Sequence, residues 1–126
     1  MLSATCHCGA LTIEIPEQPT EITNCNCSIC RRLGTLWAYY LFDQIRIKGH
    51  PENTDTYIQG DRKLKLVRCK TCGCTSHWEP LEVKITSRIG VNVRNFKPEE
   101  IGSARMRLLD GADTWKSTFW EPPSEA

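Results

Sequence analysis

The sequence lacks any long apolar run, and no segment approaches the ~18 residues that a membrane-spanning helix requires. Its beginning, Met1 to Cys6, has neither the basic segment nor the apolar core of an export signal. These two absences predict a cytoplasmic protein that does not enter a membrane. Structural disulfides are rare in a reducing cytosol, so the cysteines of this chain need another explanation.

The sequence also lacks a surplus of charge of either sign. The 16 Lys and Arg residues against 15 Asp and Glu give a formal net charge of +1. This balance argues against a broad electrostatic surface for nucleic acid or for an anionic membrane. The only basic run comprises Lys63, Lys65, Arg68 and Lys70. We see no Walker loop, dinucleotide-binding glycine motif or Ser/His/Asp grouping, so nothing indicates the enzyme classes that use them.

The length and the apolar pattern predict one mainly β domain. The 126 residues fit a single domain, which we place at residues 1–120, with residues 121–126 as a disordered tail. Alternating apolar residues predict short strands at 11–15, 36–41, 42–47, 56–58, 64–68, 83–85, 89–93 and 106–108. We expect helical turns only at 28–33, ended by Gly34, and at 97–101. Many short strands with few helices are typical of a mainly β domain.

Cysteine is abundant, and it occurs in close clusters. The eight cysteines are Cys6 and Cys8; Cys25, Cys27 and Cys30; and Cys69, Cys72 and Cys74. C-x-C and C-x-x-C spacings let a tight turn direct two thiolates at one ion, and tetrahedral Zn²⁺ accepts four such ligands. Disulfides between such close residues would be strained, and the spacings do not match the usual ferredoxin runs. The clusters therefore predict zinc, although a rubredoxin-like iron remains an alternative because both metals use tetrahedral thiolate sites.

Ligand counting indicates how the thiols divide between two ions. The economical division places Cys6, Cys8, Cys69 and Cys72 in one closed structural site. It leaves Cys25, Cys27 and Cys30 as a three-ligand site with one open position, the arrangement of a catalytic zinc. Counting alone does not fix this pairing. Cys74 is left over as a buried apolar thiol, a redox-sensitive thiol or a further ligand.

The motifs C-H-C-G, C-N-C-S-I-C-R-R and C-K-T-C-G, in this order and spacing, resemble the glutathione-dependent formaldehyde-activating enzyme family. That family shares its domain with centromere protein V. The resemblance implies a β-tent fold of short antiparallel strands that binds two zinc ions per chain. It assigns the structural zinc to Cys6, Cys8, Cys69 and Cys72, and the second zinc to Cys25, Cys27 and Cys30. Asn26 departs from the family motif, which usually has a histidine there, but that position is not a ligand in the family.

The resemblance also implies a carbon–sulfur lyase that forms S-hydroxymethylglutathione from formaldehyde and glutathione. Glutathione would then be the co-substrate, and the partners would be small-molecule thiols or aldehyde adducts rather than nucleic acid. Three thiolates already donate strongly to the metal, which favours thiol binding over Lewis-acid activation as the role of the zinc. Arg31, Arg32 and Lys70 are candidates for contacts with the glutathione carboxylates, because of their charge and their nearness to cysteines.

The alternative function is a non-catalytic zinc module that binds protein or nucleic acid. Compact zinc–thiolate domains often serve this purpose. Outside the cysteines, His77 is the better polar site candidate, although a core role is favoured for it. We expect His50 to face solvent in a turn, and Trp37, Tyr39 and Tyr40 to belong to the sheet core.

Overall fold

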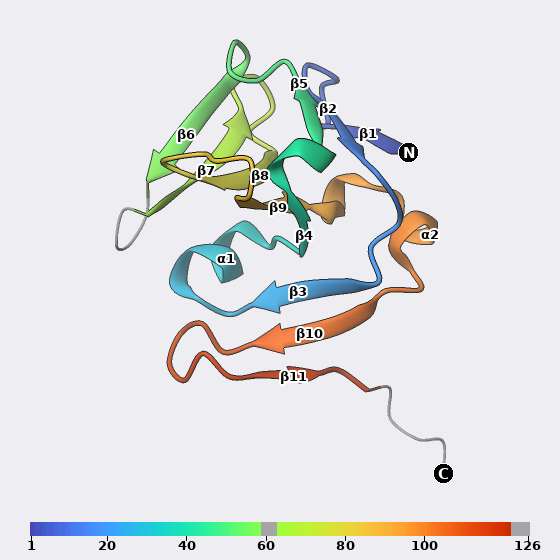
Figure 1. Ribbon diagram of the computed structural model, residues 1–126, viewed down its shortest axis with the longest axis vertical. Coiled ribbons are helices and arrows are strands. Elements are labelled where there is room, and N and C mark those ends of the chain that lie inside the picture. The colour runs from blue at the N-terminus through green and yellow to red at the C-terminus, as the bar shows by residue number, and fades with distance from the viewer. Residues whose placement is uncertain (59–62, 122–126) are drawn as a thin grey trace.

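The computed structural model describes residues 1–58 and 63–121, and Figure 1 shows its ribbon. The described strands are β1 (Leu2–Thr5), β2 (Thr12–Ile15), β3 (Glu21–Cys25), β4 (Trp37–Leu41), β5 (Arg46–Lys48), β6 (Thr54–Ile58), β7 (Leu64–Cys69), β8 (Thr75–Pro80), β9 (Arg88–Asn92), β10 (Arg105–Leu109) and β11 (Ser117–Phe119). The helices are α1 (Ser28–Leu33) and α2 (Pro98–Ile101), with 3-10 turns η1 at Phe42–Gln44 and η2 at Val93–Asn95. The expected tail lies, apart from Glu121, outside the described residues.

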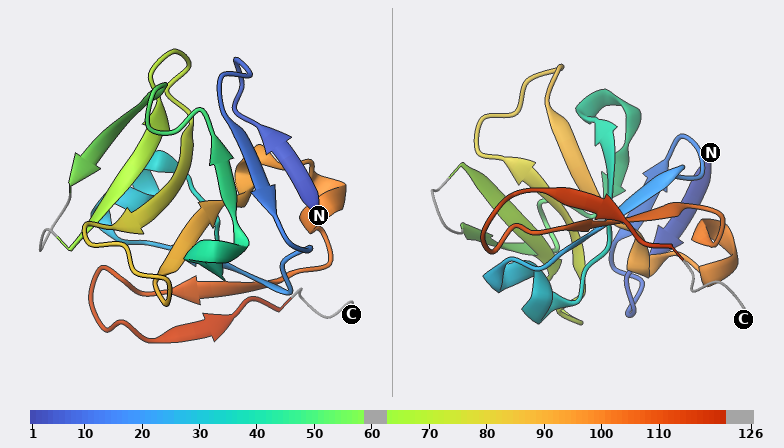
Figure 2. Two further views of the ribbon diagram at one scale, coloured as in Figure 1. Left: turned by 45° about the horizontal axis from the view of Figure 1, so that its top comes forward. Right: turned by 90° about the horizontal axis from the view of Figure 1, so that it is seen from below.

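The strands form two sheets, which confirms the mainly β class. The smaller sheet has the order β1-β2-β5 and the larger one β11-β10-β3-β4-β9-β8-β7-β6. The pairings are antiparallel except that β10 runs parallel to β3. In the left view of Figure 2, β1–β2 and β6–β8 lean toward each other at the top, and β10 and β11 cross below them. The described residues contain no helix of the length and apolar character needed to cross a membrane.

The main core fills the space between the two sheets. Ile13 and Ile15 of β2 are fully buried and pack with Ile89 and Val91 of β9. Strand alternation explains this, since every second side chain of β2 points to the same face. Fully burying an aliphatic side chain of this size contributes about 1.5–3 kcal/mol. This core therefore fixes the small sheet against the strands that carry the candidate site.

One expected strand is wrong, and the strand expected at 42–47 is only partly confirmed, by β5 at Arg46–Lys48. Residues 83–85 lie in the loop between β8 and β9, where Val83 is 38% and Ile85 70% exposed. Their alternation matches that of β9, but β9 pairs with β4 and β8, and its Ile89 and Val91 pack into the main core. Residues 42–44 form the 3-10 turn η1 instead of extended chain, because the Gln44 side chain accepts a hydrogen bond from the Leu41 N–H.

Candidate metal centres

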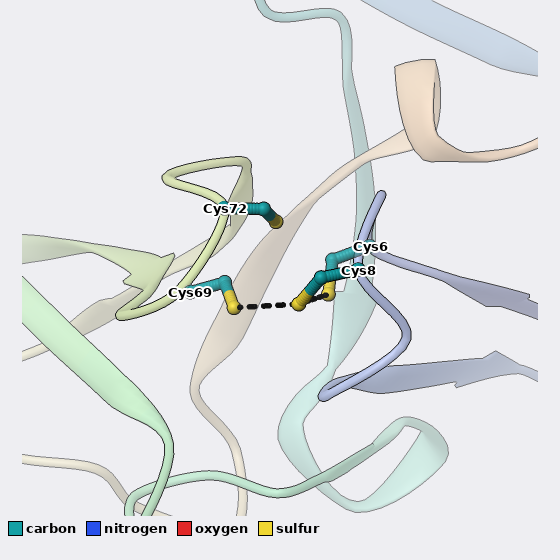
Figure 3. A group of neighbouring side chains, drawn as sticks. All are labelled: Cys6, Cys8, Cys69 and Cys72. Atoms are coloured by element: carbon teal, nitrogen blue, oxygen red, sulfur yellow. Dashed lines mark hydrogen bonds between the residues drawn. The ribbon is translucent and has the colours of Figure 1, made fainter.

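Four cysteine sulfurs meet where the small sheet approaches the large one. Cys6 and Cys8 lie in the turn between β1 and β2, while Cys69 ends β7 and Cys72 lies in the turn before β8. Figure 3 shows the four side chains converging, and all four sulfurs lie within 4.8 Å of one another. The Cys6–Cys8 and Cys8–Cys69 sulfur distances are 3.7 and 3.5 Å. A tetrahedral zinc with Zn–S bonds of about 2.3 Å separates its sulfurs by about 3.8 Å, so this donor set fits zinc.

Backbone N–H groups around this four-sulfur group favour thiolates. The Leu11 N–H donates to the Cys6 sulfur at 3.4 Å. Backbone N–H groups of Cys74 and Cys8 donate to the Cys72 sulfur and lower the pKa of that thiol to about 5. Hydrogen bonds to the charged form of an acid favour that form. Metal binding also requires the thiolate, which these contacts favour at Cys72. At Cys8 the lowering by the Ala10 N–H is outweighed by sulfur contacts, above all that with Cys69, which raise its pKa to about 11.

The glycines of these two turns have a backbone conformation that other residues rarely adopt. Gly9 and Gly73 have φ of 86° and 77°. Their N–H groups donate to the Cys6 and Cys69 carbonyls at 3.1 and 3.0 Å. Glycine adopts positive φ without the penalty that a Cβ brings. It therefore lets each turn close tightly around its cysteines.

The middle cluster forms at the junction of β3 and α1. Cys25 ends β3, Cys27 is the N-cap of α1 and Cys30 lies within α1. Their three sulfurs also lie within 4.8 Å of one another, and no fourth His, Cys, Asp or Glu of the described chain joins them. The Cys30 N–H donates to the Cys27 sulfur at 3.5 Å, and the Trp37 indole N–H donates to the Cys30 sulfur at 3.4 Å.

Hydrogen bonds also prepare Cys25 for metal binding. The Cys30 thiol and the backbone N–H of Cys27 donate to the Cys25 sulfur and lower its pKa to about 6, against the opposing effect of burial. The same contact with Cys25 raises the pKa of the Cys30 thiol, so the two sulfurs share a proton that a metal would displace. The three thiols therefore fit a metal with three protein ligands and one open position, which is the arrangement of catalytic zinc.

The loop between β10 and β11 closes one side of this cluster. A Cβ added at Gly111 would lie 2.7 Å from the Cys25 sulfur, so the loop backbone lies against the cluster. Asn26 holds the loop there: its side-chain amide donates to the Asp110 carboxylate at 3.0 Å and accepts from the Ala112 N–H at 3.0 Å. Sequence reasoning gave Asn26 no role. Its position between two cysteines was the only signal, because both partners lie more than eighty residues away.

A cavity of about 150 Å³ lies beside the middle cluster. It is lined by the three cysteines and by apolar or aromatic residues, namely Ile29, Trp37, Tyr39, Leu64, Leu66, Trp78, Leu109 and Trp115. Tyr39 and Trp78 contact each other, with ring centroids 6.1 Å apart. Trp37 and Tyr39, expected in the sheet core, thus also form part of the cavity wall. Of these wall residues, sequence reasoning placed none at the site, because four different strands, the helix α1 and the β10–β11 loop bring them together.

A third group of possible metal ligands consists of His50, His77 and Glu79. The two imidazole Nε2 atoms lie 3.3 and 3.1 Å from the Glu79 carboxylate oxygens. The expectation that His50 faces solvent is wrong, because Glu79 and the Thr54 hydroxyl, 2.8 Å away, partner both of its ring nitrogens. The Lys65 ammonium adds a further contact to Glu79 at 3.2 Å. Each ligand atom of this group therefore already has a protein partner.

The pKa values of Glu79 and His77 depend on their burial and on the contacts between the members of this group. Burial alone would raise the pKa of Glu79, but the hydrogen bond and charge of His77 and the charge of His50 hold it at about 2. Burial lowers the pKa of His77, which is 1% exposed. His77 thus has a core position, as expected. The Lys65–Glu79 contact also removes one ammonium from the basic run on which a nucleic-acid surface would depend.

The three candidates for carboxylate contacts do not line the cavity. Arg31 and Arg32 lie exposed in the last turn of α1, and Arg32 donates to the Ser28 carbonyl at 2.7 Å. Lys70 is exposed and follows Cys69 at the four-sulfur group. Cys74 lies outside both sulfur groups and packs against Cys6, Leu11 and Cys69. This packing agrees with its interpretation as an apolar thiol.

Comparison with known proteins gives two matches. A sequence model of a family described as glutathione-dependent formaldehyde-activating enzyme matches residues 1–107. The crystal structure of a Rhodobacter sphaeroides protein, a Northeast Structural Genomics target, is 31% identical in sequence and superposes with a TM-score of 0.68. That match covers 83% of this chain and 99% of the other. The Asp110–Lys116 loop lies beyond the residues that the family model matches.

Proposed function

The chain belongs to the glutathione-dependent formaldehyde-activating enzyme family, and on that premise we propose that it is a zinc-dependent carbon–sulfur lyase. Its substrate would be the adduct of a thiol with an aldehyde, as in S-hydroxymethylglutathione. One observation carries the proposal: the sulfurs of Cys25, Cys27 and Cys30 converge beside a cavity, without a fourth ligand from the described chain. A closed site would leave no room for substrate.

The residues of the middle cluster suit the binding of a metal that must also bind substrate. Cys25, Cys27 and Cys30 would hold the zinc, and the N–H groups of Cys30 and Trp37 would stabilise the sulfur charges. A free thiol with a pKa of ~8.5 is mostly protonated at neutral pH. Bound zinc would keep the substrate sulfur as a thiolate. Cys6, Cys8, Cys69 and Cys72 would hold a second, structural zinc.

The reaction needs few further groups. The thiolate sulfur attacks the carbonyl carbon, a carbon–sulfur bond forms, and the carbonyl π electrons move to the oxygen, which takes up one proton. The thiol loses one proton on ionisation, so the sum is the addition of a thiol across a carbonyl group. Tyr39 lines the cavity, and burial raises the pKa of its hydroxyl. It therefore stays protonated, and we propose that it donates a hydrogen bond to the developing oxyanion, while solvent supplies the proton. The reverse steps cleave the adduct.

Cobalt substitution and metal analysis test the proposal. We expect two zinc ions per chain in the wild type and one in Cys27→Ala, with Cys74→Ala as the matched control that retains two. In the cobalt-substituted protein, a thiol should shift the absorption bands of the middle site, and Cys27→Ala should abolish the shift. If the wild type binds only one metal ion, or if no thiol shifts the cobalt absorption bands, the lyase proposal is contradicted.

A further inference from the structure

We propose that the substrate carries an uncharged apolar group, about the size of a benzene ring, which fills the cavity beside the middle cluster. This inference rests on the proposed lyase function and concerns the class of substrate. The group would belong to the thiol, whose sulfur would bind the metal held by Cys25, Cys27 and Cys30. The substrate class is therefore the adducts of carbonyl compounds with small thiols that carry an aromatic or bulky aliphatic group.

The walls of the cavity are apolar. Leu64, Leu66 and Leu109 provide aliphatic surface. Trp37, Tyr39, Trp78 and Trp115 provide four aromatic rings. An apolar group gains roughly 25 cal/mol for each Å² removed from water. Aromatic groups gain further from edge-to-face or offset contacts at centroid distances of about 4.5–7 Å, the range in which Tyr39 and Trp78 already lie, at 6.1 Å.

The volume of the cavity limits the size of the group. The cavity measures about 150 Å³. An apolar cavity of ~150 Å³ in another protein holds one benzene molecule, whereas pockets for drug-sized ligands measure roughly 300–1,000 Å³. A tripeptide does not fit within it. Formaldehyde, which has no carbon substituent, would leave the aromatic walls without contact.

The charges around the cavity disfavour glutathione as the group that fills it. Glutathione has two carboxylates and an ammonium group, and burying such charges without partners is costly. Apart from the three cysteines that would hold the zinc, none of the described lining residues is charged. Arg31 and Arg32 are exposed on α1 and do not line it. The charged parts of glutathione would have to remain outside, where they contribute little binding free energy.

Part of the wall belongs to a segment beyond the family match. The family model matches residues 1–107, while Leu109 and Trp115 come from later residues. Trp115 has φ of 60°, a left-handed conformation that is strained for a bulky residue. Strain of this kind persists where the surroundings fix it, and it clusters at ligand sites. In this proposal Leu109 and Trp115, which is 68% exposed, contribute to the preference for an apolar group.

The test compares thiols on the cobalt-substituted protein. Dissociation constants come from the shift of the absorption bands on titration with 2-phenylethanethiol, 2-mercaptoethanol and glutathione. We expect 2-phenylethanethiol to bind at least tenfold more tightly than either other thiol. Trp115→Ala should reduce this preference at least threefold. Trp120→Ala should leave it unchanged, since Trp120 is also an exposed tryptophan but does not line the cavity.

The outcomes separate this inference from the function on which it rests. Glutathione binding as tightly as 2-phenylethanethiol, or a preference that survives Trp115→Ala, would overturn the substrate class and leave the lyase proposal standing. If no thiol shifts the cobalt absorption bands, both the substrate class and the lyase proposal are overturned. Near-ultraviolet circular dichroism of the two tryptophan variants shows whether each retains the fold.

Discussion

At the scale of single residues, the site depends on contacts that join distant parts of the chain. The cysteines could be grouped from the sequence because their spacing restricts how an ion can be bound. The structure brings together the same two groups of sulfurs that ligand counting had paired. Asn26 and Gly111 could not be recognised, because an amide or a glycine has a role only once its partner is known. Zinc itself stays a prediction from the donor set.

Gly111→Ala should weaken metal binding at the middle cluster only. The added Cβ would lie 2.7 Å from the Cys25 sulfur, so either the loop or the thiol must move. Loss of a supporting contact typically lowers metal affinity about 10–100-fold, and we expect at least tenfold here. Competition with a chelator measures the affinity of each site. The control is Ala112→Ser, which adds one atom at the exposed neighbouring position and should match the wild type in metal affinity. If Gly111→Ala and Ala112→Ser bind metal equally well at the middle cluster, the steric argument is disproved.

At the scale of elements, the alternation of apolar residues predicted the strands that have one apolar face. β2 and β9 were expected from their alternating valines, isoleucines and leucines, and α1 from its stop at Gly34, which has φ of 69°. β8 was not expected, because its sequence Thr75–Pro80 is largely polar. Its Ser76, His77 and Glu79 are buried nevertheless, since each finds a hydrogen-bond partner. Such compensation comes partly from neighbours on β8 itself and partly from other strands, as with Ser76 and the Val67 carbonyl, and a hydropathy pattern does not reveal it.

The buried group on β8 should make stability depend on pH. The folded pKa of Glu79 is about 2, below its ordinary value of 4.5. Its contribution is therefore present above pH 4.5 and is lost as the pH falls toward 2. At about 1.4 kcal/mol per pKa unit, the full effect is about 3 kcal/mol. His77 acts in the same direction: burial lowers its pKa, so its contribution falls as the pH drops below its ordinary value of 6.5.

Glu79→Gln tests this dependence. We expect the variant to be less stable at pH 7 by about 2–3 kcal/mol, because the two imidazoles and Lys65 lose their charged acceptor. It should also lose less further stability than the wild type between pH 5 and 3. Denaturant unfolding at several pH values measures both effects. The control is Glu21→Gln, which removes an exposed partner of Arg107. If wild type and Glu79→Gln show the same dependence of stability on pH, Glu79 is not its source.

At the scale of the whole molecule, the four-sulfur group connects the two sheets. Cys6 and Cys8 come from the β1–β2 turn of the small sheet, whereas Cys69 and Cys72 come from the β7–β8 turn of the large one. The middle cluster, by contrast, lies at one β3–α1 junction. An ion in the first group restrains the whole chain. An ion in the second restrains only a local turn.

Cys69→Ser should therefore lower the melting temperature far more than Cys27→Ser. Binding of a structural zinc contributes directly to the free energy of folding. We expect Cys69→Ser to lower Tm by about 10 °C or more, and Cys27→Ser by only a few degrees. Differential scanning calorimetry of the zinc-loaded proteins measures both. Equal losses of Tm would show that the four-sulfur group does not hold the sheets together.

The parallel pairing of β10 with β3 has a consequence for the order of assembly. Leu109 pairs in register with Cys25, although translation produces the two strands far apart in time. When the ribosome has released the three thiols of the middle cluster, neither Leu109 nor Trp115 yet exists to cover them. The nascent chain can thus take up its ion from the cell before its binding chamber is built.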